Sequence, residues 1–198
     1  IMEIDNTNLH NYIKIYDDIL RKEQLNNFIR ICDNRKEFNQ ASIVGSKENP
    51  NRIDRKIRDV QAWDLGNMGV ESRTDIYWAN YFCFQITNHL KKYAGEIGMD
   101  AGNESIISMQ LLKYENNGHY RFHVDHGKAV PRTISCIFFV NDNYKGGELA
   151  FKFPGSSQEL VIEKKSNRLI IWPSNFLYPH AVKPVTEGIR YSVVAWAL

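Results

Sequence analysis

Apolar side chains follow a helical period in two segments of the first half of the chain. They recur three and four residues apart over residues 17–37 and 74–97, a spacing that predicts amphipathic helices with one face on a core. Asp17 stands at the start of the first segment and Thr74 at the start of the second, where helix N-termini favour anions and capping hydroxyls. Gly98 follows the second segment, at a position where many helices end.

The second half of the chain carries short apolar runs separated by glycine-rich turns. Runs of this length and spacing are typical of strands in closed or double-layered antiparallel β structures. We therefore expect an α+β fold that is mainly β, with the two helices packed on one side of the β structure. The predicted strands cover residues 105–114, 120–124, 133–140, 148–153, 159–162, 168–172 and 189–197.

Residues 45–59 are polar and rich in turn formers, including Gly45 and Pro50. Short strands are predicted on either side, over residues 41–44 and 57–63. Few apolar side chains are available to hold this segment against a core, which places it among the least stable parts of the molecule. We interpret it as a mobile loop that closes over a site when substrate binds.

Composition narrows the functional classes. The 198 residues suffice for one domain, and 43% hydrophobic with 24% charged residues is ordinary for a globular protein. A net charge of +2 with mixed signs gives no footprint for nucleic acid or a membrane surface, and no apolar run approaches the ~20 residues of a membrane span. Three distant cysteines without a CxxC pair, and a start without an apolar signal segment, lead us to expect a reducing, cytoplasmic location.

The stretch GHYRFHVDHG, residues 118–127, gathers three histidines and one aspartate. If the strand predicted here extends to Asp125, then His123 and Asp125 share one face, and His126 points away from it. One imidazole and one carboxylate supply two ligands for a divalent metal and require a third from elsewhere. An HxD pair is weak evidence alone, and a polar surface hairpin is the alternative.

A third candidate ligand is His180, at the start of a predicted strand, although a lone histidine there is more often structural. Ten residues later, the run RYSVVAW places Arg190, Ser192 and Trp196 on one strand face. An arginine among apolar neighbours needs an anionic partner, because a buried unpaired charge is costly, and a ligand carboxylate can serve. Two histidines and one carboxylate leave three metal positions open, as in non-haem Fe(II) oxygenases. Zinc is the rival metal, but it does not account for the arginine.

The second half of the chain also matches a known family, through segments that occur in family order. They read YENNGHYRFHVDHG, RTISCIFFVND, KGGELAF, SNRLIIWPS, PHAVKPV and GIRYSVVAW. This text resembles the prolyl 4-hydroxylase branch of the Fe(II)/2-oxoglutarate-dependent dioxygenases over residues 105–198, whereas the first half matches only loosely. The resemblance implies a double-stranded β-helix, a jelly-roll or cupin-like core, with supporting helices N-terminal to it. It implies a single dioxygenase domain over 1–198, with helical support and a substrate loop in 1–103 and the catalytic core in 104–198.

The resemblance further implies roles for individual residues. The implied iron ligands are His123, Asp125 and His180. The implied contacts of the co-substrate 2-oxoglutarate are Arg190, at its distal carboxylate, and Tyr114. The implied substrate contacts are Tyr120, Arg132 and Trp196, of which Tyr120 and Trp196 are equally compatible with core packing. O₂ is the second co-substrate, ascorbate is a further candidate cofactor, and the chemistry requires no general base.

Two positions depart from the collagen-type members of the family. Those members usually have Lys at the position of Arg190 and Thr at the position of Leu149. Arg together with Leu resembles the oxygen-sensing prolyl hydroxylases and many microbial members. Ser192, two residues after Arg190 on the same face, can supply the hydroxyl that Leu149 lacks.

The implied reaction is hydroxylation of an unactivated C–H bond in a proline of a peptide or protein partner, with release of succinate and CO₂. Three alternatives stay open from the sequence. One is a hydroxylase of a free amino acid or another small molecule. A second is a nucleic-acid demethylase, but that branch resembles an R-x₅-R pattern, and Trp196 breaks it. The third is a non-catalytic β-helix module that binds metal, against which the retention of three ligands and Arg190 argues.

Overall fold

The computed structural model describes residues 7–44, 51–65, 72–99, 105–128 and 131–198. The helices in these residues are α1 (Thr7–His10), α2 (Lys22–Asn34) and α3 (Arg73–Glu96). The strands are β1 (Lys14–Asp17), β2 (Asn39–Gln40), β3 (Ile43–Val44), β4 (Asn51–Arg52), β5 (Arg58–Asp59), β6 (Gln61–Asp64), β7 (Ile106–Tyr114), β8 (His119–His123), β9 (Ile134–Phe139), β10 (Lys145–Gly146), β11 (Leu149–Phe151), β12 (Leu160–Ile162), β13 (Arg168–Pro173), β14 (His180–Val182), β15 (Val185–Glu187) and β16 (Arg190–Ala197).

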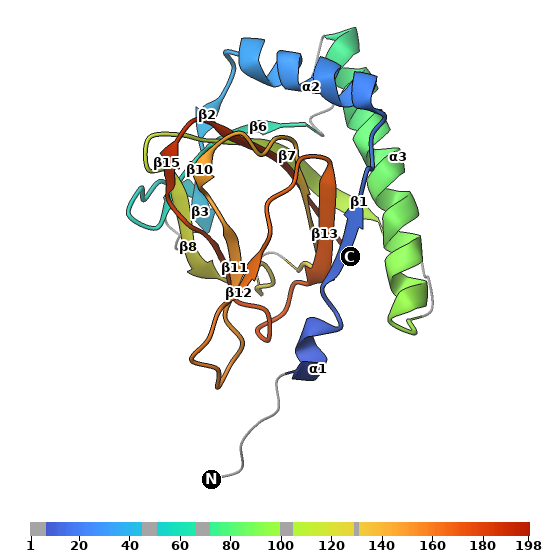
Figure 1. The fold of residues 1–198 in the computed structure, drawn as a ribbon, viewed down its shortest axis with the longest axis vertical. Helices are drawn as coiled ribbons and strands as arrows, with labels where there is room; N and C mark the ends of the chain where they lie inside the picture. The colour runs from blue at the N-terminus through green and yellow to red at the C-terminus, as the bar shows by residue number, and fades with distance from the viewer. Residues whose placement is uncertain (1–6, 45–50, 66–71, 100–104, 129–130) are drawn as a thin grey trace.

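Two antiparallel sheets form the body of the molecule (Figure 1). The larger sheet has seven strands in the order β1-β13-β9-β16-β7-β6-β2, and the smaller has five in the order β12-β11-β14-β8-β5. Two short ladders, β10–β15 and β3–β4, complete the described pairings. Since many neighbours in these sheets are distant in sequence, the chain crosses repeatedly between the two layers.

Alternation along the strands of the larger sheet separates two hydrophobic cores. On β9, Cys136 and Phe138 belong to the core shared with α2 and α3; in Figure 1, α2 lies across the top of the molecule and α3 along its right side. Ile137 and Phe139 belong to the core between the two sheets, together with Phe151 of β11. The expected mainly β fold, a double-stranded β-helix with helices on one side, is confirmed. The core between the sheets encloses the candidate site.

The strands predicted in the second half are all present, each within two residues of its predicted ends, as β7, β8, β9, β11, β12, β13 and β16. The strand expected at His180 is β14. The short strands β10 and β15, which pair with each other, were not predicted. Short two- and three-residue strands carry too little periodicity to be recognised in a sequence.

The first predicted helix was wrong at its N-terminal end. Asp17 is the last residue of β1, where it pairs with Arg168 of β13, and α2 begins only at Lys22. The carboxylate of Asp17 accepts a hydrogen bond from Arg168 Nε at 2.7 Å. A pairing with a strand distant in sequence therefore outweighs the local preference of an aspartate for a helix start.

The second predicted helix agrees with α3 to within one residue at each end. Its predicted cap, Thr74, was wrong. The cap is Ser72, whose side-chain oxygen accepts a hydrogen bond from the backbone N–H of Asp75 at 3.4 Å. Both serine and threonine are favoured at this position, so the cap could be predicted only to within two residues.

The segment predicted as one strand over residues 57–63 is two strands in different sheets. β5 pairs with β8 in the smaller sheet, whereas β6 pairs with β7 in the larger sheet. Val60 lies between them and is buried. The predicted strand over 41–44 is also shorter, since β3 begins at Ile43. A segment that crosses between layers within three residues presents no uniform alternation from which the break can be recognised.

The predicted loop over residues 45–59 is only partly described, because residues 45–50 lie outside the described residues. The described part includes β4, which pairs with β3, and β5. Closure of this segment over the site stays a prediction, as does the division of the chain near residue 103. No helix in the described residues is long and apolar enough to cross a membrane. The three cysteines carry free thiols, as expected.

Candidate metal centre and anion site

The three predicted metal ligands converge at one end of the smaller sheet. His123 ends β8 and is the register partner of His180, which begins β14. Asp125 follows two residues after His123, in a bend beyond the strand, so the turn rather than strand alternation brings it to the histidines. One candidate ligand atom of each residue lies within 4.8 Å of the others. Within the described part of the chain, this is the one such cluster of three.

Both histidines present the same ring nitrogen to the centre. Nδ1 of His123 lies 2.8 Å from the carbonyl oxygen of Arg121, and Nδ1 of His180 lies 3.1 Å from that of Tyr178. Because a carbonyl oxygen only accepts, each Nδ1 carries the hydrogen. Each Nε2 is then free to bind a metal, and these atoms lie 3.5 and 3.4 Å from the two carboxylate oxygens of Asp125.

The protonation states suit a divalent cation. Burial lowers the pKa of His180 to about 4, so its ring is neutral at neutral pH. Burial acts against the charged form of Asp125, but its interactions with His180, His123 and the Ser135 hydroxyl outweigh burial and hold its pKa well below the ordinary value. Two histidines and one carboxylate on one side of an ion are the donor set that non-haem Fe(II) uses, and they leave further positions open.

Arg190 forms a second polar centre on the inner face of β16. Its side chain is fully buried, and its Nη1 donates a hydrogen bond to Ser192 Oγ at 3.0 Å. The guanidinium lies over the rings of Tyr114 and Phe139, at 4.9 and 5.2 Å from their centroids. Nε and Nη2 find no hydrogen-bond partner among the described residues. A cation in this setting calls for an anion that the described residues do not supply.

Gly147 gives Arg190 the space that it occupies. A Cβ atom at position 147 would lie 3.0 Å from Arg190 Cδ, 2.9 Å from a methyl of Val185 and 3.0 Å from the ring of Tyr144. The residue also has a φ of +68°, which favours glycine. The second glycine of the GGE sequence therefore allows the guanidinium to lie where it does.

The metal centre and the arginine lie toward opposite ends of one inner face. On β16, Ser192 pairs with Phe139 of β9, and Trp196 pairs with Ser135, whose hydroxyl contacts Asp125. A small cavity lies between the two ends and is lined by the three candidate ligands and by Tyr114. Its remaining lining includes Leu112, Ile137, Leu149, Trp172 and Val194. The cavity thus joins a metal donor set to the neighbourhood of an unpaired cation through apolar walls.

The predicted substrate residues surround the metal centre. The ring of Tyr120 stacks on that of His123, with centroids 3.5 Å apart and planes inclined by 17°. Arg132 lies over the ring of Trp196, at 3.6 Å, and its Nη1 is 3.8 Å from Asp125 Oδ1. Tyr120 and Trp196 both line the small cavity. Tyr120 and Trp196 thus share the wall of the small cavity with the three candidate ligands.

Several neighbours of the site were not predicted from the sequence. Ser135, Ser174 and Trp172 are buried beside the triad, and Arg58 lies over the ring of Tyr120 at 4.9 Å. The signal for Ser135 was present, because it is a polar residue in the otherwise apolar run ISCIFF of β9. Arg58 could not be recognised in the same way, since it stands in a basic, polar segment.

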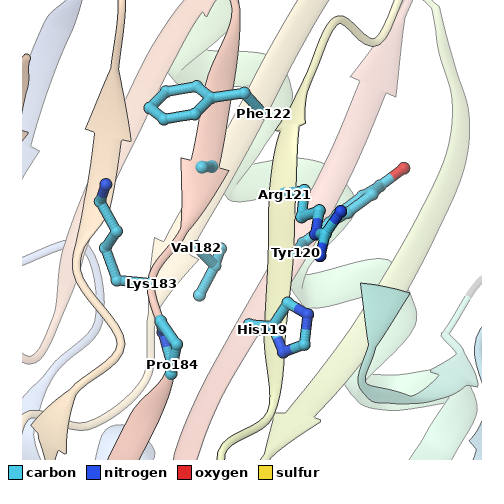
Figure 2. A pocket seen from close by; sticks show the side chains of 8 residues that line it. His119, Tyr120, Arg121, Phe122, Val182, Lys183 and Pro184 are labelled. Carbon is cyan, nitrogen blue, oxygen red and sulfur yellow. The ribbon is translucent and has the colours of Figure 1, made fainter. Parts of the chain in front are cut away.

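A larger hollow of about 580 Å³ lies over β8 and β14 (Figure 2). Phe122 and Lys183 lie at one end of it in Figure 2, and His119 and Pro184 lie at the other. None of the three candidate ligands lines this hollow. Tyr120 and Val182 line both the hollow and the small cavity, so they form the wall between them. The candidate chemistry belongs to the smaller cavity, because the donor groups converge there.

Comparison with known proteins agrees with this geometry. Residues 109–198 match the model of the 2OG-Fe(II) oxygenase superfamily. A PKHD-type hydroxylase of Aliarcobacter butzleri is 37% identical over 101 residues, which cover 46% of this chain and 43% of that protein. The chain thus spans less than half the length of this relative.

Solved structures share the fold over nearly the whole chain. A prolyl-4-hydroxylase of Pseudomonas putida superimposes with a TM-score of 0.69 and 19% identity, covering 94% of this chain and 92% of that one. A prolyl hydroxylase of Trichoplax adhaerens, solved in complex with a peptide fragment of the hypoxia inducible factor oxygen degradation domain, gives 0.67 and 18% identity, covering 95% and 84%. At these identities the likeness concerns the fold.

Proposed function

We propose that the chain is a member of the 2OG-Fe(II) oxygenase superfamily, whose model matches residues 109–198, and that it is an Fe(II)- and 2-oxoglutarate-dependent dioxygenase that hydroxylates a prolyl residue in a peptide. One observation carries the proposal. A cluster of two histidines and one carboxylate shares a buried inner face with an arginine whose guanidinium lacks an anionic partner among the described residues. A metal alone would account for the first feature and leave the second unexplained.

His123, Asp125 and His180 would hold the iron. When bound with 2-oxoglutarate and O₂, iron supplies the oxidative decarboxylation to succinate and CO₂ and the hydroxylation of a C–H bond. The protein sets the geometry: the carbonyl oxygens next to the two Nδ1 atoms orient the imidazoles. The ring of Tyr120, stacked on His123, covers one side of that ligand and limits access of water.

Arg190 would bind the distal carboxylate of 2-oxoglutarate. Its free Nε and Nη2 can donate to two carboxylate oxygens, and Ser192 holds Nη1 from the other side. The neighbouring rings of Tyr114 and Phe139 keep water away, which strengthens a charge-assisted contact. Leu149 in the cavity wall has no hydroxyl to offer, so this contact relies on Arg190 and its neighbours.

A peptide substrate is supported by Arg132 and Trp196 at the metal end. Arg132 lies flat on Trp196, and its Nε has no hydrogen-bond partner among the described residues. A peptide carbonyl could accept from that nitrogen, and the indole offers an apolar surface to a pyrrolidine ring. Proline-rich peptides are already extended and lose little entropy on docking. The Trichoplax adhaerens prolyl hydroxylase was solved with a peptide bound, which points in the same direction.

The first experiment tests the cofactors. Anaerobic addition of Fe(II) and 2-oxoglutarate to the full chain is expected to give a weak visible charge-transfer band, and the His180→Ala variant is expected to give none. The second experiment tests the substrate by mass spectrometry, with proline-rich peptides and free proline offered separately. A product 16 mass units heavier from the peptides supports the proposal. Turnover of free proline or another metabolite without any peptide product would replace the peptide by a small molecule.

A further inference from the structure

The hydroxyl groups of Ser135 and Ser174 form a chain that ends on the carboxylate of Asp125. Ser135 Oγ lies 2.7 Å from Asp125 Oδ2 and 2.7 Å from Ser174 Oγ, and both serines are 1% exposed. We propose that this serine pair is a positioning element that fixes the orientation of Asp125 and thereby sets the affinity and coordination geometry of the metal. The inference rests on the proposed function of the triad as a metal site.

The direction of the two hydrogen bonds follows from the available hydrogens. An ionised carboxylate only accepts, so the single hydroxyl hydrogen of Ser135 goes to Asp125. The hydrogen between the serines therefore comes from Ser174, and the chain runs from Ser174 through Ser135 to Asp125. Successive hydrogen bonds polarise one another, so Ser174 strengthens the bond that Ser135 donates.

Asp125 needs such a partner because its place in the fold does not fix its carboxylate. It lies in a bend beyond β8, and the terminal torsion of an aspartate side chain has a broad distribution. The hydrogen bond to Oδ2 selects the orientation in which each carboxylate oxygen faces one histidine, at 3.5 and 3.4 Å. Arg132 Nη1 is 3.8 Å from Oδ1, too far for a hydrogen bond that could do the same.

Both serines are anchored in rigid structure. Ser135 lies on β9 between β13 and β16, where it pairs with Trp172 and Trp196. The backbone N–H of Ser174 donates to the carbonyl of Thr133 at 2.9 Å, and its own carbonyl accepts from the N–H of His126 at 3.0 Å. The residue after Asp125 is thus tied to the same serine. The pair therefore transfers the rigidity of the larger sheet to a ligand that lies in a bend.

The test measures Co(II) binding to the full chain by visible absorption, whose intensity reports coordination geometry, with 2-oxoglutarate turnover as a second readout. Ser135→Ala is expected to bind Co(II) about 10-fold more weakly and with an altered spectrum, in the range known for residues that orient metal ligands. Ser174→Ala is expected to lose about 3-fold, because it acts through its neighbour. Ser135→Thr keeps the hydroxyl and is expected to return to within about 2-fold of the wild type.

A control and a double variant separate positioning from general damage. Ser166→Ala removes a hydroxyl that donates to the carbonyl of Val140 at 2.7 Å, outside the site, and is expected to leave Co(II) binding unchanged. The double variant Ser135→Ala/Ser174→Ala is expected to bind no more weakly than Ser135→Ala alone, since the second serine acts only through the first. If the losses of Co(II) affinity in the two single variants simply add in the double variant, the proposed chain of hydrogen bonds is wrong.

Thermal unfolding reports whether each variant folds. If Ser135→Ala does not fold, the test relies on Ser174→Ala. A folded Ser174→Ala variant with the wild-type Co(II) affinity and spectrum overturns the inference. If the wild type binds Co(II) and His180→Ala does not, that behaviour of Ser174→Ala contradicts the role of the serine pair and leaves the proposed metal site intact. If the wild type itself binds no Co(II), the proposed metal site falls together with the inference.

Discussion

The two polar centres of the inner face differ in how completely their hydrogen bonds are satisfied. At the metal end, each histidine Nδ1 has a carbonyl partner and Asp125 has the hydroxyl of Ser135. At the other end, Arg190 is fully buried, and two of its guanidinium nitrogens have no partner among the described residues. The groups of the first centre find hydrogen-bond partners within the described residues, whereas the second centre has two unpartnered donors that a bound anion would satisfy.

This difference predicts opposite consequences for stability and binding. Removing His180 from the first centre would take away a proposed metal ligand together with its ring contacts to Phe151 and Trp172. Removing the unsatisfied cation takes away a ligand contact and also relieves the protein of an unpaired buried charge. The two ends can therefore be told apart by comparing activity, co-substrate affinity and the free energy of unfolding across matched variants.

The largest effect is expected at the metal end. His180→Ala and Asp125→Ala should abolish 2-oxoglutarate turnover, because each removes one of three metal bonds, while circular dichroism should show a folded protein. His126→Ala is the matched control, since this exposed histidine lies next to Asp125 outside the cluster, and it should retain activity. Full Fe(II)-dependent succinate production by His180→Ala would show that the ligands were assigned wrongly.

Arg190→Ala should raise the KM for 2-oxoglutarate by at least about 30-fold, because a buried charge-assisted contact is worth roughly 2–5 kcal/mol. Co(II) affinity in the absence of 2-oxoglutarate should change little, since the guanidinium does not contact the triad. The KM of Arg190→Lys for 2-oxoglutarate should lie between those of the wild type and Arg190→Ala, because lysine keeps the charge and loses the bidentate geometry. Steady-state kinetics and Co(II) titration decide the matter. An unchanged KM for 2-oxoglutarate in Arg190→Ala would show that Arg190 does not bind the co-substrate.

The third effect concerns stability without ligand. Arg190→Met should be at least as stable as the wild type, with a gain of up to ~4 kcal/mol, because an apolar side chain replaces an unpaired buried charge. Co(II) with 2-oxoglutarate should raise the melting temperature of the wild type more than that of this variant. Arg168→Met is the control, since Arg168 is bonded to Asp17 and its loss should destabilise. A less stable Arg190→Met would mean that the guanidinium is already satisfied.

The smallest effect is a pH dependence that belongs to the metal end alone. Burial lowers the pKa of His180 to about 4, whereas an unfolded histidine titrates near ~6.5. The unfolded chain therefore takes up the proton first as the pH falls, and the metal-free protein loses stability between about pH 6.5 and 4. The contribution is fully present above pH ~7. Urea unfolding in the presence of a chelator gives the free energy of unfolding at each pH. Its dependence on pH should be weaker for His180→Asn than for the wild type, and unchanged for the control variant of an exposed residue, His10→Asn.

The site residues that could be predicted are those marked by strand pattern, by spacing or by the family resemblance. His123, Asp125, His180 and Arg190 could be identified because strand order, spacing and family text converge on them, and the structure brings the first three together. The serine chain could not be anticipated. Its hydrogen bonds join residues 10 and 39 positions apart, through a bend whose path follows from packing rather than from periodicity.

The errors in the fold have the same origin. Asp17 looked like a helix start because its immediate neighbours favour one, yet its partner Arg168 is 151 residues away. The segment over 57–63 looked like one strand because its residue types suit a strand throughout, yet its two parts join different sheets on either side of Val60. Pairings of this kind reflect long-range contacts, which intrinsic strand or helix preference does not report.

Gly147 has a consequence for directed evolution of the protein. The atoms that a Cβ would meet at this position belong to Val185, Arg190 and Tyr144, so any side chain there would press on the aliphatic part of Arg190, at Cδ. Libraries aimed at other 2-oxo acids should therefore hold position 147 constant and diversify residues that line the small cavity, at Leu112, Leu149 and Val194. If all four codons were randomised, most clones would carry a side chain at position 147 that displaces Arg190.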